Sequence, residues 1–206
     1  MAIFRIEVIV PYLKTNEMRK LKLQMQITVD GYVAGTNGEL DWMIMEDCHV
    51  EVKNSENGLI DSSDTILMGR KMTNEFVKYW ENVKPDSSEF SFAKKMIDTP
   101  KIVFSKTIKS IAGKNIAVEN GDLTTVVNNL KNKEGKDILV YGGAGFVSSL
   151  IKEGLIDEFN FFVHPVMINN GMRIFDLLKK RQKLSLLSST AYDCGVTVIS
   201  YKLNND

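Results

Sequence analysis

The most regular pattern in the chain is an alternation of apolar and polar residues over residues 21–29. This period of two is that of a β-strand with one buried face. Three shorter runs, at residues 65–68, 101–104 and 138–141, are almost continuously apolar, which is typical of strands buried on both faces. Residues 159–166 form a further apolar segment of strand length. The pattern predicts short strands distributed along the whole chain.

Helical patterns separate these strands. Residues 70–80 and 146–152 each follow a strand directly and are predicted to be helical, and a further helix is expected over about residues 43–52. Over residues 123–131, leucines and valines recur at the spacing of one helix face. Strands that alternate with helices imply right-handed crossovers and a largely parallel sheet.

The C-terminal part has a different pattern. Residues 184–192 and 196–203 are separated by Asp193-Cys194-Gly195, a turn signal that predicts an antiparallel hairpin. The fold class expected is therefore α/β, with helices on both faces of a mostly parallel sheet that ends in this hairpin. We see no repeat or linker, so residues 18–206 are predicted to form one domain. Residues 1–17 are taken as an N-terminal extension, either an extra strand or a segment that is not native.

Charge and composition exclude several functions. The chain has 26 Lys and Arg and 26 Asp and Glu, so it lacks the positive field expected of a nucleic-acid-binding protein. No apolar run approaches the ~20 residues that a transmembrane helix needs. Two cysteines, Cys48 and Cys194, and two histidines match no metal-site spacing. We expect a cytoplasmic protein with free thiols, no metal, no membrane and no nucleic-acid partner.

Three of the predicted strands end in small residues: Met68-Gly69-Arg70, Phe104-Ser105-Lys106 and Tyr141-Gly142-Gly143-Ala144-Gly145. Ligands of open α/β sheets bind at the carboxyl ends of the strands. Helix N-termini there present free N–H groups that favour phosphate, and glycine allows close backbone approach. Each signal is weak alone, and their joint placement predicts a phosphate-binding site.

Residues 142–147 are the predicted pyrophosphate cradle. Arg70 and Lys106, at two other strand ends, supply cations for another phosphate. A phosphate held apart from the pyrophosphate matches a ribose 2′-phosphate, which favours NADPH over NADH as cofactor.

Five motifs, in this order, resemble the dihydrofolate-reductase-like superfamily, including the reductase domain of bifunctional riboflavin-biosynthesis proteins. They lie at residues 28–35 (TVDGYVAG), 37–42 (NGELDW), 66–73 (ILMGRKMT), 102–105 (IVFS) and 141–145 (YGGAG). The resemblance covers residues 18–203 and implies a three-layer fold with NADPH bound across the sheet. It also implies a homodimer paired through the late strands.

The resemblance assigns cofactor positions residue by residue. Residues 35–42 resemble a mobile flap over cofactor and substrate. The cofactor residues are, near the adenosine phosphates, Gly69, Arg70, Lys71 and Met72; at the 2′-phosphate, Ser105 and Lys106; at the pyrophosphate, Gly142, Gly143, Ala144, Gly145, Phe146 and Val147; and around the nicotinamide, Ile27, Val33 and Ala34.

The resemblance also implies a catalytic acid shortly after Trp42. Asp47 is the best match, ahead of Glu46, and the alternative is that both lie on the solvated face of a helix. Asp30 and Asp41 are weaker candidates. Trp42 is expected to stack on substrate or to pin the flap. His164 is interpreted as a core residue rather than a general acid.

The predicted activity is hydride transfer from NADPH to a C=N or C=O bond of a small heterocyclic or sugar-derived substrate. The folate-anchoring arginine of the superfamily is absent, with Lys101 as a weaker substitute, and Tyr32 and Tyr141 stand where the riboflavin branch has lysine and glutamate. Two alternatives remain: the riboflavin-biosynthesis reductase proper, and an NADPH-binding sensor without catalysis.

Overall fold

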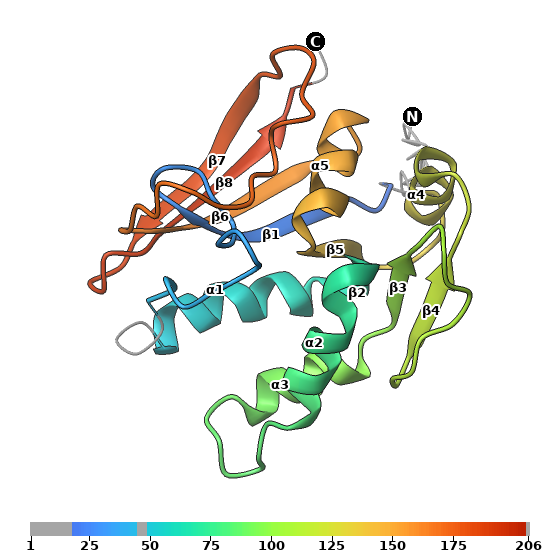
Figure 1. Ribbon diagram of the computed structural model, residues 1–206, viewed down its shortest axis with the longest axis horizontal. Coiled ribbons are helices and arrows are strands. Elements are labelled where there is room, and N and C mark those ends of the chain that lie inside the picture. Colours follow the sequence, from blue (N-terminus) through green and yellow to red (C-terminus); the bar gives the residue numbers. More distant parts are fainter. Residues whose placement is uncertain (1–17, 45–48, 205–206) are drawn as a thin grey trace, which may run out of the picture.

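The computed structural model describes residues 18–44 and 49–204, which form an eight-stranded sheet with helices on both sides (Figure 1). The strands are ordered β4-β3-β2-β5-β1-β6-β8-β7. The strands are β1 (Leu21–Thr28), β2 (Ser63–Gly69), β3 (Lys101–Phe104), β4 (Ile116–Glu119), β5 (Asp137–Gly142), β6 (Glu158–His164), β7 (Leu184–Ala191) and β8 (Thr197–Leu203). The helices are α1 (His49–Asp61), α2 (Arg70–Glu81), α3 (Phe90–Asp98), α4 (Leu123–Lys131) and α5 (Ala144–Lys152).

Strands β1 to β6 run parallel to one another, and β8 pairs antiparallel with β6 and β7. This arrangement confirms the predicted mostly parallel sheet with a C-terminal hairpin. The parallel strands share one carboxyl edge, so the segments that follow β2, β3 and β5 start from the same side of the sheet.

Two apolar clusters sandwich the sheet and confirm the three layers. The alternating residues of β1, from Leu21 to Ile27, point to one face, where they pack with α4 and α5. On the other face, Phe76 and Trp80 of α2 pack with α3 and with the end of α1. In Figure 1, α1, α2 and α3 lie together on this second side. Among the described residues, no helix is long and apolar enough to cross a bilayer.

The hairpin turns where the sequence predicts. Tyr192 N donates to Val196 O at 2.9 Å, and Gly195 takes a positive φ of 89°. One expectation was wrong, because Cys194 is disulfide-bonded rather than a free thiol. The outermost strand, β7, exposes several leucines, and the homodimer through the late strands stays a prediction.

Two elements were not anticipated and one was misplaced. The helix expected over residues 43–52 is described as α1, His49–Asp61, and so extends further along the chain. Helix α3 and the short strand β4 were missed. Strand β4 has four residues and no fully buried side chain, so its pattern is too short to stand out.

Lys101, the first residue of β3, caps the C-terminus of α3. Its side chain is buried, and Nζ donates to the carbonyl oxygens of Met96, Ile97 and Thr99 at 2.9, 2.8 and 2.7 Å. These are carbonyls that a helix C-terminus leaves without partners. All three ammonium protons are therefore used inside the fold, so Lys101 does not replace the folate-anchoring arginine.

We predict that Lys101→Met lowers the free energy of unfolding by about 1–3 kcal/mol, because buried carbonyls lose their donor. Burial lowers the pKa of Lys101 from 10.5 to about 8. Between these values the unfolded chain binds more protons, so this group makes the protein more stable as the pH rises from 8 to 10.5. Urea unfolding across this range should show that rise in the wild type and not in Lys101→Met.

Lys94→Met is the matched control. Lys94 forms an exposed ion pair with Asp98 on the same helix, so its loss should cost less than about 1 kcal/mol. Equal losses in the two variants would contradict the capping role of Lys101.

Candidate functional site

Two helices begin at glycines on the carboxyl edge of the sheet. The N-cap of α2 is Gly69 and that of α5 is Gly143, and neither has a side chain to cap the first turn. Helix α4 differs, because Asp122 Oδ1 accepts from Thr125 N at 2.9 Å. The starts of α2 and α5 therefore keep backbone N–H groups for an anion.

The two glycine-containing turns touch each other. A Cβ on Gly143 would lie 3.4 Å from Gly69 Cα, and a Cβ on Gly69 would lie 2.8 Å from Phe146 Cβ. A Cβ on Gly142 would meet Met72 Sδ at 3.2 Å. Gly142 and Gly143 also have φ angles of 147° and 93°, which side chains other than hydrogen rarely allow. The structure thus brings the predicted β2–α2 and β5–α5 loops together.

The third predicted loop joins this pair through an aromatic contact. Phe104, at the end of β3, stacks on Phe146 with ring centroids 5.1 Å apart. Ser105 is buried, and its Oγ accepts the N–H groups of Thr107 and Ile108 at 3.1 and 3.2 Å. Its hydroxyl therefore closes a turn that leaves Lys106 exposed.

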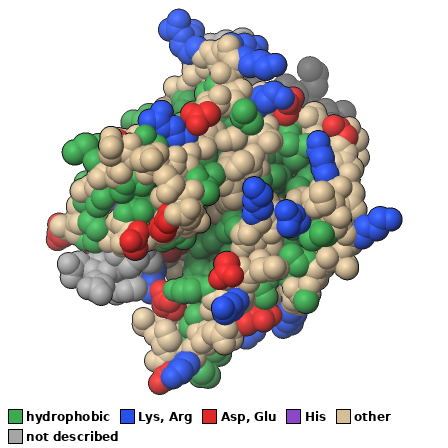
Figure 2. All heavy atoms as spheres, viewed as in Figure 1, with side chains coloured by type: hydrophobic (Ala, Val, Ile, Leu, Met, Phe, Trp, Pro, Cys, Tyr) green, Lys and Arg blue, Asp and Glu red, His purple; other side chains and the backbone are tan. Residues whose placement is uncertain are grey.

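Basic side chains at these loops reach solvent. Arg70, Lys71 and Lys106 are all exposed. The pKa of Asp122 is lowered chiefly by the N–H of Thr125, and the charge of Lys106 contributes. Figure 2 shows Lys and Arg side chains interspersed with Asp and Glu over the face in view.

Other predicted cofactor residues have structural partners. Val147 is completely buried, and its N–H bonds Gly143 O at 2.9 Å, whereas Ala144 is half-buried and Gly145 is exposed. Ile27 lies in the core. Val33 N donates to Met172 O and Ala34 O accepts from Met172 N, at 2.9 and 2.8 Å.

The glycine-rich loop of residues 35–44 is folded on itself. Gly35 N and Trp42 Nε1 both donate to Glu39 O, at 2.9 and 3.2 Å. The half-buried Trp42 ring meets His164 edge-on at 5.4 Å, and Ile44 N donates to His164 Nδ1 at 3.1 Å. His164, on β6, is therefore the anchor of the end of this loop.

The predicted carboxylates differ in outcome. Asp47 and Glu46 lie outside the described residues, and Asp41 is exposed. Asp30 accepts from Thr28 Oγ1 at 2.6 Å and from Asn169 N at 2.8 Å. The Thr28 hydrogen bond, followed by backbone N–H groups, lowers the pKa of Asp30 despite some desolvation. Asp30 is thus an ionised anchor and a poor proton donor.

Glu56 is a buried acid that was not anticipated from the sequence. On α1, Val52, Glu56 and Ile60 are 7%, 8% and 3% exposed, so they form one buried stripe. Glu56 Oε1 accepts from Gln26 Nε2 at 2.8 Å and from Gln24 Nε2 at 3.2 Å. Burial raises the pKa of Glu56 to about 7, opposed by the charge of Lys53. The sequence signal for a buried acid was the position of Glu56, four residues after Val52 and four before Ile60, on the same apolar face of the helix.

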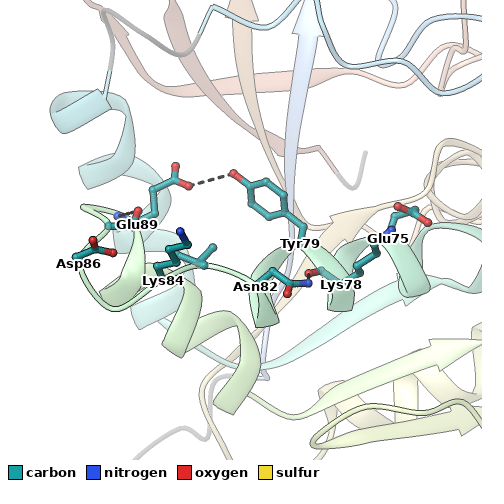
Figure 3. A pocket seen from close by; sticks show the side chains of 9 residues that line it. Glu75, Lys78, Tyr79, Asn82, Lys84, Asp86 and Glu89 are labelled. Carbon is teal, nitrogen blue, oxygen red and sulfur yellow. Dashed lines mark hydrogen bonds between the residues drawn. The ribbon is translucent and has the colours of Figure 1, made fainter.

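A hollow of about 550 Å³ lies between α2 and the segment before α3 (Figure 3). It contains none of the glycine-loop residues. At its wall Tyr79 OH donates to Glu89 Oε2 at 3.0 Å, and Glu89 Oε1 pairs with Lys53 Nζ on α1 at 2.9 Å. The lining is mixed in charge, with Glu75, Lys78, Asn82 and Lys84 also present.

Comparison with known proteins identifies a family over most of the chain. Residues 19–198 match the model of the RibD C-terminal domain. The chain belongs to this family. The Bacillus subtilis protein YyaP, whose function is not established, is 34% identical over 195 residues, which cover 92% of this chain and 99% of YyaP.

Solved structures define the fold of this RibD C-terminal domain. A Shewanella structure described as a riboflavin biosynthesis protein superposes with a TM-score of 0.73 at 21% sequence identity. The match covers 91% of this chain and the whole of that chain. Dihydrofolate reductase from Enterococcus faecalis, solved with NADP(H), superposes with a TM-score of 0.59 at 12% sequence identity. The match covers 90% of this chain and 97% of the reductase chain. The fold is therefore dihydrofolate-reductase-like, as the motifs predicted.

We predict that Gly69→Ala destabilises the protein by about 1–3 kcal/mol, because its Cβ forces the two loops apart. Gly145→Ala is the control, since its Cβ meets no atom within 4 Å and lies in the first turn of α5. That variant should be as stable as the wild type or up to about 1 kcal/mol more stable. Thermal unfolding compares them, and a tolerated Gly69→Ala would contradict the close packing.

Proposed function

We propose that this RibD C-terminal domain protein is an NADPH-dependent reductase. Its substrate would be a small heterocyclic or sugar-derived molecule that accepts hydride at a C=N or C=O bond. The observation that carries the proposal is the contact between two helix N-termini at Gly69 and Gly143, both without side-chain caps. Membership of a family of reductase domains supports it.

The residues present fit a phosphorylated dinucleotide. The first turn of α5 would take the pyrophosphate through its N–H groups, and the first turn of α2 would take a neighbouring phosphate. Lys106 and Arg70, both exposed beside these turns, would bind the 2′-phosphate. The bound cofactor supplies hydride from its nicotinamide ring.

The chain's own part in the reaction is orientation and proton supply. Trp42, packed against His164, would form one wall of the substrate site. Asp47 is the proposed proton donor to the heteroatom that receives no hydride, directly or through water. The Shewanella structure is described as a riboflavin biosynthesis protein, and this description supports one specific alternative, that the chain is the riboflavin-biosynthesis reductase proper.

A thermal-shift titration with NADPH and NADH tests the cofactor assignment. A ligand at 100 times its Kd stabilises a protein by about 2.7 kcal/mol. We expect a larger shift with NADPH than with NADH, and a smaller difference in Lys106→Gln because one cation of the phosphate site is lost. Lys109→Gln, an exposed lysine of the same segment, is the matched control. Equal thermal shifts with NADPH and NADH would contradict the assignment of Arg70 and Lys106 to a 2′-phosphate site.

Asp47→Asn should lower turnover and leave NADPH affinity intact, because the carboxyl acts on substrate rather than on cofactor. The assay follows loss of NADPH absorbance with a panel of pterins, aminopyrimidines and carbonyl compounds. Unchanged turnover in the variant would remove Asp47 from the mechanism. Tight NADPH binding without oxidation by any panel member would favour the sensor alternative.

A further inference from the structure

The face of β1 that looks toward α1 is polar at the centre of the sheet. Leu21, Leu23, Met25 and Ile27 fill the opposite face, so Gln24 and Gln26 point toward α1. Gln24 is 3% exposed and its α1 partner Glu56 is 8% exposed. Buried polar groups in native proteins are almost always hydrogen-bonded, and departures from an apolar core often mark functional positions.

The direction of each hydrogen bond follows from the one before it. Glu56 accepts, so Gln26 must present its amide nitrogen to it at 2.8 Å. The amide oxygen of Gln26 then faces His164 Nε2, also at 2.8 Å, which requires a hydrogen on that ring nitrogen. Burial lowers the pKa of His164 to about 4, so the ring is neutral and Nδ1 is free to accept from Ile44 N. Glu56 thus determines the orientation of Gln26 and the tautomer of His164.

One atom of this network has no partner. Gln24 Nε2 donates to Glu56, but Gln24 Oε1 is buried and accepts from nothing among the described residues. An ionised carboxylate offers no hydrogen to this oxygen. A carboxylic acid does, because its O–H can donate to the amide oxygen while its C=O accepts from the amide nitrogen.

We propose that Glu56 is a positioning residue of the reductase site. It is held as a neutral acid and donates a hydrogen bond to Gln24. Through Gln26 and His164 it fixes the position at which the loop of residues 35–44 ends. The functional meaning rests on the proposed reductase, because this loop carries Trp42. The hydrogen-bonded network itself does not depend on the cofactor.

The charges around Glu56 agree with a neutral acid near pH 7. Desolvation raises its pKa to about 7, the positive Lys53 on the same helix opposes this, and Glu89 before α3 adds to it. The hydroxyls of Tyr79 on α2 and Tyr141 on β5 also sense the charge of Glu56. An ionised Glu56 still accepts from Gln26, but its carboxylate repels the buried Gln24 oxygen. We therefore expect Glu56 to move away from Gln24 on ionisation and to carry Gln26, and with it the His164 anchor of Ile44, along.

Fluorine NMR of the full chain labelled with 5-fluorotryptophan tests this directly. The chain has two tryptophans, Trp42 against His164 and Trp80 in the core, and Trp42→Phe assigns their resonances. We expect the Trp42 resonance to titrate with a midpoint near 7, following Glu56, while the Trp80 resonance does not follow this transition.

Glu56→Gln mimics the neutral acid, so its Trp42 resonance should stay at the low-pH position across the titration. Gln26→Leu breaks the relay and should also abolish the transition. Glu51→Gln, an exposed acid on the same helix, is the control and should leave it unchanged. A wild-type Trp42 resonance without a transition near 7, or a transition that persists in Glu56→Gln, overturns the proposal.

Should Glu56→Gln fail to fold, carbon NMR of the wild type labelled at glutamate carboxyls decides the same point. One carboxyl should titrate near 7, well above the ordinary ~4.3 for glutamate. If every glutamate titrates near its ordinary value, Glu56 is not a neutral acid. Neither experiment contains cofactor, so a failure here is distinct from failure of the NADPH titration.

Discussion

The close packing of two turns, one after β2 and one after β5, is the constraint on which the site depends. A carbon added at Gly143 would lie 3.4 Å from Gly69 Cα, and one added at Gly69 would lie 2.8 Å from Phe146 Cβ on α5. The glycines let two helix N-termini start side by side at one edge of the sheet. In the proposed reductase, the backbone N–H groups of both first turns would bind the phosphates of one dinucleotide.

The two sides of the central strand β1 have different roles. Its apolar residues join β1 to α4 and α5 in a continuous core. Its glutamines instead bond a buried glutamate of α1, and one of them continues to His164 at the carboxyl edge. The carboxyl edge of the sheet thus carries the two glycine turns and a polar network that contacts the loop bearing Trp42.

Local patterns predicted most of the fold because strands such as β1 and helices such as α4 follow one period over their whole length. Helix α3 was missed because its C-terminal carbonyls are capped by Lys101, a buried lysine at the start of β3 that was read only as part of a strand. Glu56 was missed for a different reason, since its partners lie about 30 residues away on β1. The glycines were predicted as site residues because the ends of the strands can be recognised in the sequence. That their loops meet could not be predicted, because it depends on the order of the strands in the sheet, in which β2 lies beside β5.

Amide NMR of the labelled protein, titrated with 2′-phospho-ADP-ribose, tests the shared anion site most directly. We predict that the N–H resonances of residues 69–72 and 142–147 shift together with one dissociation constant. If neither loop responds, or one responds while the other stays unchanged at saturation, the two helix N-termini do not form a single dinucleotide site.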